Sequence, residues 1–242
     1  EETGQLVVFA SDADDLAPGD DNRRSDVYLD AGSDALVRLS DLDGRAPDGA
    51  SRDPRLSRDG RWVVYTTHAT DLLPGKTTEL GDIVLHDLRT GERTCVSRAP
   101  DGAEADGPSG LPDVSGDGRF VVFQSWAGNL VADDTNGRGD VFVHDRTTGA
   151  TRRVSVAADG TEAHGDSTHP ALSADGRFVS FSSDAPDLVA GDTNGVADVF
   201  VVELATGAVE RVNLGEDGVQ ADAGGGLFPR SALSADGRHV AF

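Results

Sequence analysis

The stretch that decides the fold is Ser173–Phe181, which reads Ser-Ala-Asp-Gly-Arg-Phe-Val-Ser-Phe. The motif Ser-x-Asp-Gly-Arg, followed by a short apolar run, recurs with its Asp at positions 59, 117, 175 and 236, which are 58, 58 and 61 residues apart. A second Asp-Gly pair keeps the 58-residue period throughout, with its Gly at 44, 102, 160 and 218, so we place the three extra residues at 224–226. A fixed period indicates one supersecondary unit stacked repeatedly, because a single unit cannot bury its own apolar face.

Each repeat predicts four short strands and no helix. In the third repeat a semi-apolar first strand over 112–115 leads into a tight turn at 116–119, where Asp and Gly tolerate positive φ angles. The β-branched and aromatic run 120–123 is expected to be buried on both faces. Residues 140–145 indicate a third strand and 151–156 a half-exposed outer strand. Four antiparallel strands in a unit of this length are typical of a β-propeller blade.

The two ends of the chain offset the repeats by one strand. Residues 5–9 match the second strand of a blade without its first, whereas 232–234 and 238–242 supply a first and a second strand. A surplus strand in a closed ring would expose an apolar edge. The sequence therefore predicts an all-β propeller of four-stranded antiparallel blades, with about four repeats and a partial blade, forming an incomplete arc of a larger propeller.

We predict one domain over residues 1–242, because no change of composition marks a linker. The absence of Met and the start at Glu1 suggest a piece excised from a longer protein. The repeats run over approximately 1–53, 54–111, 112–169, 170–229 and a partial 230–242.

Composition limits the classes of partner. The formal net charge is −22, and such a field repels phosphate backbones and anionic lipid head groups, which argues against nucleic acid and membrane partners. Lys76 is the sole lysine among 21 basic residues, and Cys95 is the sole cysteine, so no disulfide can form within the chain. Cys95 lies in a predicted strand, which favours a buried structural thiol.

Ser173–Phe181, followed by Asp198–Val201 and by Thr206-Gly207, resembles the TolB-type, WD40-like β-propeller repeats common in secreted and periplasmic bacterial proteins. The likeness recurs in every repeat and covers essentially the whole chain. The resemblance implies a propeller fold and a secreted or periplasmic location. It implies little about activity, since such propellers serve as binding platforms, as gating domains beside hydrolases and occasionally as enzymes.

The long loop between the second and third strands carries a recurring set of side-chain oxygens. Residues 134–140 and 192–198 share Asp-x-Asn-Gly-x-x-Asp, and 20–26 keeps the oxygen-bearing positions. Ca²⁺ takes about six to eight oxygen ligands, and these oxygens could converge on one ion around a Gly turn. The predicted ligands are Asp20, Asn22, Asp26, Asp134, Asn136, Asp140, Asp192, Asn194 and Asp198.

Two observations weigh against calcium in these loops. The spacing is similar to the cation loops of integrin-type propellers, but those carry a further acidic residue where this chain has Arg138 and Val196. The second repeat has Lys76 in place of the first Asp, so an ammonium could sit where an ion would sit. The alternative is that Asp and Asn cap a turn through hydrogen bonds to the backbone.

Other candidate residues favour structural roles. The Asp of Ser-x-Asp-Gly-Arg recurs in every unit, which indicates hairpin architecture rather than catalysis. The arginines that end the motif are expected to pair with nearby carboxylates, and they are Arg61, Arg119, Arg177 and Arg238. Residues 162–169 hold the one cluster of His and acidic residues, which we interpret as an inter-blade loop rather than a zinc site. Trp126 either packs against the next blade or offers a stacking surface for a sugar or peptide.

No phosphate-binding loop, nucleophile elbow or Cys-x-x-Cys pair occurs in the sequence. We therefore predict a non-catalytic binding or scaffold propeller, with possible Ca²⁺ binding, that takes a protein, peptide or glycan ligand. The alternatives are a propeller enzyme or a substrate-gating domain of a hydrolase. An enzyme would require inward-facing His and carboxylate side chains from several blades.

Overall fold

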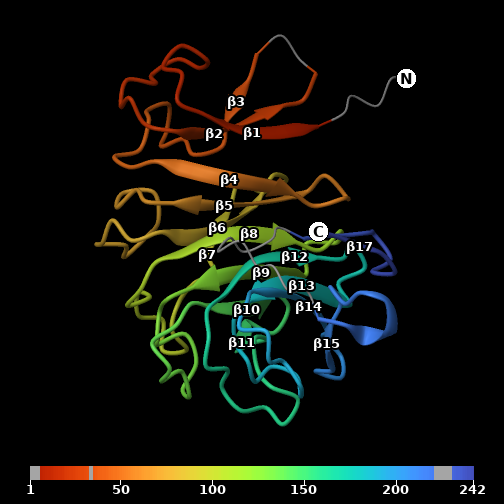
Figure 1. Cartoon of the computed structure of the whole chain (residues 1–242). Coiled ribbons are helices and arrows are strands. Elements are labelled where there is room, and N and C mark those ends of the chain that lie inside the picture. Colours follow the sequence, from red (N-terminus) through yellow and green to blue (C-terminus); the bar gives the residue numbers. More distant parts are fainter. Residues whose placement is uncertain (1–5, 33–34, 221–230) are drawn as a thin grey trace.

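The computed structural model describes residues 6–32, 35–220 and 231–242. Within these ranges the chain is built from antiparallel strands, and its one helical element is a short 3-10 turn, η1 (Glu216–Gly218). The strands form three four-stranded sheets, one three-stranded sheet and one two-stranded hairpin, which follow one another in chain order (Figure 1). The predicted all-β architecture of four-stranded blades is confirmed.

Each complete blade is a meander in which every strand pairs with its successor. The second blade comprises β4 (Ser51–Leu56), β5 (Trp62–Thr67), β6 (Asp82–Asp87) and β7 (Arg93–Cys95). The third comprises β8 (Ser109–Val114), β9 (Phe120–Ser125), β10 (Asp140–Asp145) and β11 (Ala150–Arg153). The fourth comprises β12 (Ser167–Leu172), β13 (Phe178–Ser183), β14 (Asp198–Glu203) and β15 (Val209–Arg211).

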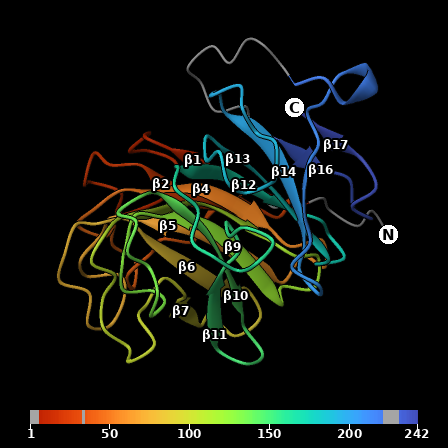
Figure 2. The same cartoon turned by 60° about the horizontal axis from the view of Figure 1, so that its bottom comes forward.

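The terminal sheets are incomplete in the way the sequence predicts. The first holds β1 (Val7–Ser11), β2 (Asp26–Asp30) and β3 (Val37–Arg38), and has no inner strand among the described residues. The last pairs β16 (Ala232–Leu233) with β17 (Val240–Ala241). Among the described residues no strand of the first sheet pairs with this hairpin, so the blades form an open arc (Figure 2). Gln5 and the predicted insertion at 224–226 lie outside the described residues.

The blades are stacked in radial order. The inner strand of each complete blade contacts the inner strand of the next, so that β4, β8, β12 and β16 follow one another along the inside of the arc. The first blade reaches this row through the contact of β1 with β4. Residues on the inner strands of several blades can therefore meet in one place.

The core lies between blades rather than within them. The second strand buries side chains on both faces, as predicted: Val64 packs toward the third blade, and Val63 packs toward the first. Phe123 and Phe142 stack with ring centroids 5.9 Å apart in the cluster shared by the second and third blades. Burial of these apolar faces is what makes neighbouring blades depend on one another.

The Ser-x-Asp-Gly-Arg turn closes through its own side chains. In the third blade the Ser115 hydroxyl donates to Asp117 (2.7 Å) and accepts the Phe120 amide (2.9 Å). The Arg119 amide also donates to Asp117, at 2.9 Å. Gly118 has a φ of 68°, in the left-handed region that glycine enters without strain. The predicted hairpin role of this Asp is confirmed.

In the three complete blades the arginine that ends the turn pairs with the third strand of its own blade, as predicted, whereas Arg238 of the last hairpin forms no ion pair with another described residue. The guanidinium-to-carboxylate distances are 2.7 Å for Arg61–Asp87, 2.8 Å for Arg119–Asp145 and 3.4 Å for Arg177–Glu203. These arginine side chains are 39–60% exposed, so each pair stabilises the fold by less than about 1 kcal/mol.

The first strand of the third blade begins earlier than predicted, at Ser109 rather than at residue 112. Its pairing with β9 shifts register between Gly110 and Asp113, and the ladder continues on both sides of this bulge. Pro112 lies within this strand and lacks the amide hydrogen of a regular ladder. A bulge accommodates it.

The outer strand of the third blade ends earlier than predicted, at Arg153 rather than at residue 156. The Ser155 side-chain oxygen accepts the Val141 amide at 3.0 Å, in place of a strand carbonyl. The same exchange occurs in the other blades, where the acceptors are Ser40, Ser97 and Asn213. The outer strand therefore leaves the ladder at this point in each of these four blades.

Candidate functional site

The inner strands of the three complete blades are irregular at one shared position. β4, β8 and β12 each shift register in their pairing with the second strand. Asp53, Leu111 and His169, which lie 58 residues apart, stand at the shift with φ of 54°, 50° and 54°. This left-handed backbone is uncommon for residues other than glycine and is unfavourable by about 1–2 kcal/mol. One strained position thus recurs with three different side chains.

These positions line a single cavity of about 210 Å³ on the inside of the arc. Its walls come from β4, β8, β12 and the β16 segment, and include Asp53, Arg55, Leu111, Asp113, His169 and Leu233. Pockets for drug-sized ligands measure about 300–1,000 Å³. The cavity therefore has room for one large side chain or for a small molecule.

Asp113 joins two blades at the wall of the cavity. Its Oδ2 accepts the Leu172 amide of β12 at 2.8 Å, and its Oδ1 accepts the Val114 amide at 2.9 Å. Burial raises the pKa of Asp113, although these two hydrogen bonds and the charge of Arg55 oppose the rise. The equivalent positions of the neighbouring repeats hold Arg55 and Ala171, so this carboxylate departs from the repeat pattern.

His169 is half-buried and held by the second strand of the preceding blade. Its amide donates to Gln124 Oε1 at 3.2 Å, and its Nδ1 lies 3.4 Å from the Thr168 hydroxyl, which itself bonds to Gln124. From the sequence, His169 was expected in an inter-blade loop, so its place in the wall of the cavity was missed. One pattern in the sequence could have indicated the cavity. The residue before a constant proline differs from repeat to repeat, in Asp53-Pro54, Leu111-Pro112 and His169-Pro170.

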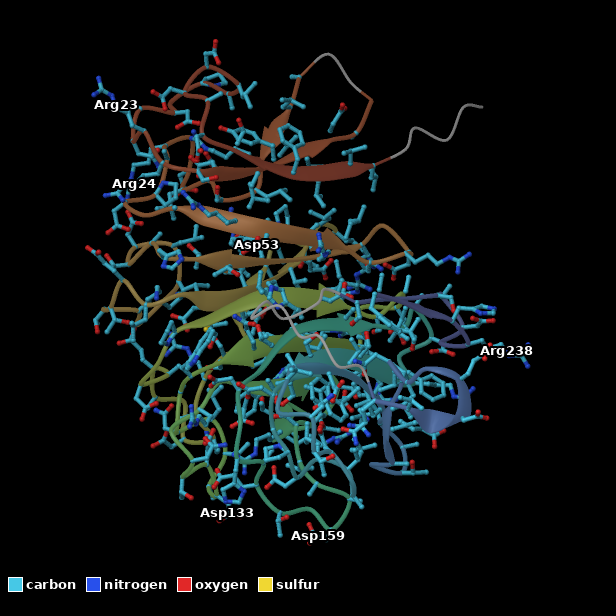
Figure 3. All side chains as sticks on the ribbon, in the orientation of Figure 1. Arg23, Arg24, Asp53, Asp133, Asp159 and Arg238 are labelled. Carbon is cyan, nitrogen blue, oxygen red and sulfur yellow. The ribbon has the colours of Figure 1, made fainter. Side chains whose placement is uncertain are left out.

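The loops predicted to bind calcium lie away from this cavity. In the view of Figure 3, Asp53 lies near the centre, whereas Arg24, in the loop of the first blade, and Asp133, in the loop of the third, lie at the edge. The cavity and these loops are two separate places on the molecule.

In the third blade, Asp134 and Asp140 meet around a side chain of the same blade. Arg153 of β11 places Nη1 3.2 Å from Asp134, 3.3 Å from Asp140 and 2.7 Å from Glu162. The Arg153 side chain is only 7% exposed. Ser155 donates to the other oxygen of Asp140 at 2.6 Å. Both oxygens of Asp140 and one oxygen of Asp134 thus contact groups of the chain itself.

The asparagines of these loops cap turns. Asn136 Oδ1 accepts the Arg138 amide at 2.7 Å, while its Nδ2 donates to Asp140 at 3.1 Å. Asn22 accepts the Arg24 amide at 2.7 Å in the same way. The turn-capping role that the sequence allows for these residues is confirmed.

The fourth blade repeats the arrangement, and the first blade does so only in part. Arg211 Nη1 lies 3.2 Å from both Asp192 and Asp198, and Asn194 Nδ2 donates to Asp198 at 3.3 Å. In the first blade Arg38 Nη1 lies 3.8 Å from Asp20, which is too long for a hydrogen bond, and the close ion pair of Arg38 is with Asp41 outside the loop, at 3.0 Å. There Asp20 also accepts the Tyr28 hydroxyl, and Asp26 accepts the Ser40 hydroxyl.

In the second blade an ammonium stands in this place. Lys76 Nζ lies 2.6 Å from both Asp82 Oδ2 and the Leu80 carbonyl oxygen, and the lysine side chain is fully buried. The predicted position of this ammonium is confirmed.

Cys95, half-buried in β7, has a thiol whose pKa is raised, first of all by burial.

The side chains of these loops, in the arrangement described, do not fit a metal ion. Ca²⁺ needs about six to eight oxygens at about 2.3–2.6 Å, but Asp134 and Asp140 already contact a guanidinium whose charge would repel the ion. In the described part of the chain, no group of three or more His, Cys, Asp or Glu side chains is arranged to hold a metal. Calcium binding itself stays a prediction until it is measured.

The cluster of His and acidic residues at 162–169 does not converge on one point. Glu162 pairs with Arg153, exposed His164 pairs with Asp187, and His169 lines the cavity. Asp187, by hydrogen bond and charge, raises the pKa of His164.

Trp126, also considered as a stacking surface, is 47% exposed, and its indole ring lies against Gly139.

Comparison with known proteins identifies the fold. No family model and no curated protein matches the chain. Among solved structures the chain is similar to TolB from Acinetobacter baumannii, at 20% identity and a TM-score of 0.56, over 98% of this chain and 46% of that one. It is also similar to a putative TolB from Agrobacterium tumefaciens, at 19% identity and a TM-score of 0.53, over 85% and 60%.

A third similar structure is dipeptidyl peptidase 4 from Porphyromonas gingivalis, at 16% identity and a TM-score of 0.52, over 96% of this chain and 34% of that one. The chain spans about half the length of the TolB structures. No helix among the described residues is long and apolar enough to cross a membrane. Blade order, strand pairing and these likenesses agree, and the chain has a TolB-like β-propeller fold.

Proposed function

We propose that the chain is a non-catalytic binding propeller whose ligand enters the cavity on the inside of the arc. One observation carries the proposal: Asp53, Leu111 and His169 share a strained backbone position in three consecutive blades, yet differ in side chain. Strain of this kind persists where the surrounding structure enforces it and clusters at functional sites. The residues that are the same in every repeat are sufficient to build a scaffold. A ligand site, by contrast, requires side chains that differ between repeats, as Asp53, Leu111 and His169 do.

The proposed ligand is a basic side chain presented by a peptide or by a protein partner. The carboxylates of Asp53 and Asp113 line the cavity, and its volume of about 210 Å³ suits one side chain. The net charge of −22 attracts cationic partners over long range. Arg55, exposed beside the two carboxylates, supplies a donor for a carbonyl oxygen of the ligand backbone.

A titration of the full chain with three peptides, followed by amide chemical shifts, tests the proposal. The peptides are Gly-Lys-Gly, Gly-Arg-Gly and Gly-Glu-Gly. We expect the two basic peptides to shift resonances of β4, β8 and β12, and the acidic peptide to leave them unchanged. Asp53→Asn should weaken binding and so reduce the shifts at a given peptide concentration, and the control Asp159→Asn, at an exposed turn far from the cavity, should keep them. Absence of shifts with both basic peptides, or equal shifts in Asp53→Asn, would overturn it.

The alternative is a propeller enzyme, favoured by one observation. His169 and Asp113 come from different blades and line one cavity, which is the arrangement that an enzyme on this fold would require. The two peptides separate the alternatives, because an enzyme acting on peptides would convert them into new species during the titration. Slow appearance of product, lost in His169→Gln, would establish the enzyme. A secreted or periplasmic location and a gating role beside a hydrolase stay predictions.

A further inference from the structure

The outer strands place one position of each blade against the acidic loop. In the strand pairing, Arg38 lies opposite Tyr28, Arg153 opposite Phe142 and Arg211 opposite Phe200. Each of these partners comes two residues after the last Asp of its loop. The three arginines are therefore equivalent by register, although the first belongs to a repeat with a different loop length.

The second blade departs from this pattern at two positions together. Cys95 lies opposite Val84, and so occupies the place of the arginines. Lys76 occupies the place of Asp134, which lies 58 residues further along the chain. The arginine is lost and an acid is replaced by lysine in the same blade. The two changes leave one buried cation beside the last Asp of the loop, here Asp82.

Each of these four blades thus has one buried cation beside its acidic loop, which comes from the outer strand in three blades and from the loop itself in the second. This constancy indicates that each blade requires the positive charge rather than a particular residue. The cationic side chains are 0–8% exposed, and the aspartates beside them are 0–5% exposed. A buried carboxylate without a counter-charge is strongly unfavourable. A divalent ion could supply that charge in an oxygen-rich loop, but here a side chain does.

We propose that each acidic loop is a one-cation site which this chain fills with its own side chain, so that the propeller needs no metal ion. We call this site the cation cage, made in the third blade by Asp134, Asp140, Glu162 and Arg153. In the second blade the cage is Asp82 with Lys76. A cage that loses its side-chain cation becomes a site for a divalent ion.

A charge-swap cycle in the second blade tests the proposal. Lys76→Asp alone gives this loop the acids of the third blade without their arginine, and we expect the melting temperature to fall by roughly 10 °C. Cys95→Arg alone places a second cation in the cage and should also lower it. The double variant rebuilds the arrangement of the third blade and should recover more than half of the loss caused by Lys76→Asp.

Calcium provides the second readout. CaCl₂ should raise the melting temperature of Lys76→Asp and leave both the unaltered chain and the double variant unchanged. Arg119→Met, which removes an exposed ion pair outside the cage, is the matched control and should show neither the large loss nor the gain. The proposal is overturned if the double variant is no more stable than Lys76→Asp, or if calcium stabilises the unaltered chain as much as Lys76→Asp. If Lys76→Asp does not fold, recovery of a folded double variant supports the proposal, and failure of both contradicts it.

Discussion

Gly118 lies against the indole ring of Trp62 in the preceding blade, so closely that a Cβ on the glycine would stand 2.0 Å from Trp62 Cδ1. The next turns repeat the contact, with Gly176 against Phe120 and Gly237 against Phe178. The glycine of Ser-x-Asp-Gly-Arg is thus required twice, for its positive φ and for the approach of one blade to the aromatic ring of another. The motif that sets the repeat also joins the blades.

Substitution of Gly118 by alanine should therefore destabilise the chain more than the same change at Gly149. Both glycines have a positive φ, but a Cβ at Gly149 meets nothing within 4 Å. We expect Gly149→Ala to lower the free energy of unfolding by about 1–2 kcal/mol, and Gly118→Ala by about 3 kcal/mol or more, because the ring must also move. Equal losses in urea unfolding would show that the close contact with Trp62 has no energetic role.

Removal of Arg153 should cost more than removal of Arg119. Arg153 is 7% exposed and faces three carboxylates, whereas Arg119 is 46% exposed and faces Asp145. We expect Arg153→Met to lower the free energy of unfolding by about 3–5 kcal/mol, because it leaves buried charge without a partner. Arg119→Met should lower it by less than about 1 kcal/mol. A similar small effect for both variants, measured by urea unfolding, would contradict this difference.

Two carboxyl groups facing Arg153 should titrate far apart. Burial and the nearby charge of Asp140 raise the pKa of Asp134 to about 6, while Arg153 opposes the rise. Burial opposes the shift of Glu162, but hydrogen bonds from Thr135 and Arg153 lower its pKa to about 2. Carboxyl ¹³C chemical shifts followed against pH measure both groups. Glu162 titrating above Asp134 would contradict the described geometry.

The two groups affect stability in opposite directions. The folded pKa of Asp134 lies above its ordinary value of 3.8, so its contribution to the free energy of unfolding falls as the pH rises from about 4 to about 6. Glu162 has a folded pKa below its ordinary value of 4.5, so its contribution is present above that value and is lost as the pH falls toward 2. Asp134→Asn should remove the first dependence and leave the second.

Asp53→Gly should separate stability from binding. Glycine adopts the φ of 54° without a side-chain clash, although it loses more backbone freedom on folding. We expect the free energy of unfolding to stay unchanged or to rise by up to about 1 kcal/mol. Binding of Gly-Arg-Gly should weaken, because a carboxylate of the cavity is lost. A large loss of stability in thermal unfolding would show that Asp53 holds the inner strand in place.

The sequence was sufficient for the blades because their information is local and repeated. The run after Arg177 is buried on both faces, and the turn before it closes through its own side chains. The bulge at Leu111 could not be predicted in this way. Its left-handed backbone depends on packing between inner strands, and leucine has no intrinsic preference for that conformation.

The cation cages were predicted only in part. The acidic loops stood out in the sequence, and Lys76 indicated that an ammonium could stand in one of them. The pairing of Arg153 with Asp140 was missed, because 13 residues separate them and only the register of β10 and β11 brings them together. His169 was missed as a cavity residue for a similar reason, since the inner strands of three blades must meet before the cavity exists.

Thermal unfolding of the unaltered chain in EDTA and in CaCl₂ tests most directly whether the side-chain cations make a metal ion unnecessary. The CaCl₂ concentration is about 10 mM, well above the ~1 mM dissociation constants of the weakest calcium modules. We predict superimposable transitions, because each cage already holds its own positive charge. A melting temperature that rises with calcium and falls with the chelator would contradict the account.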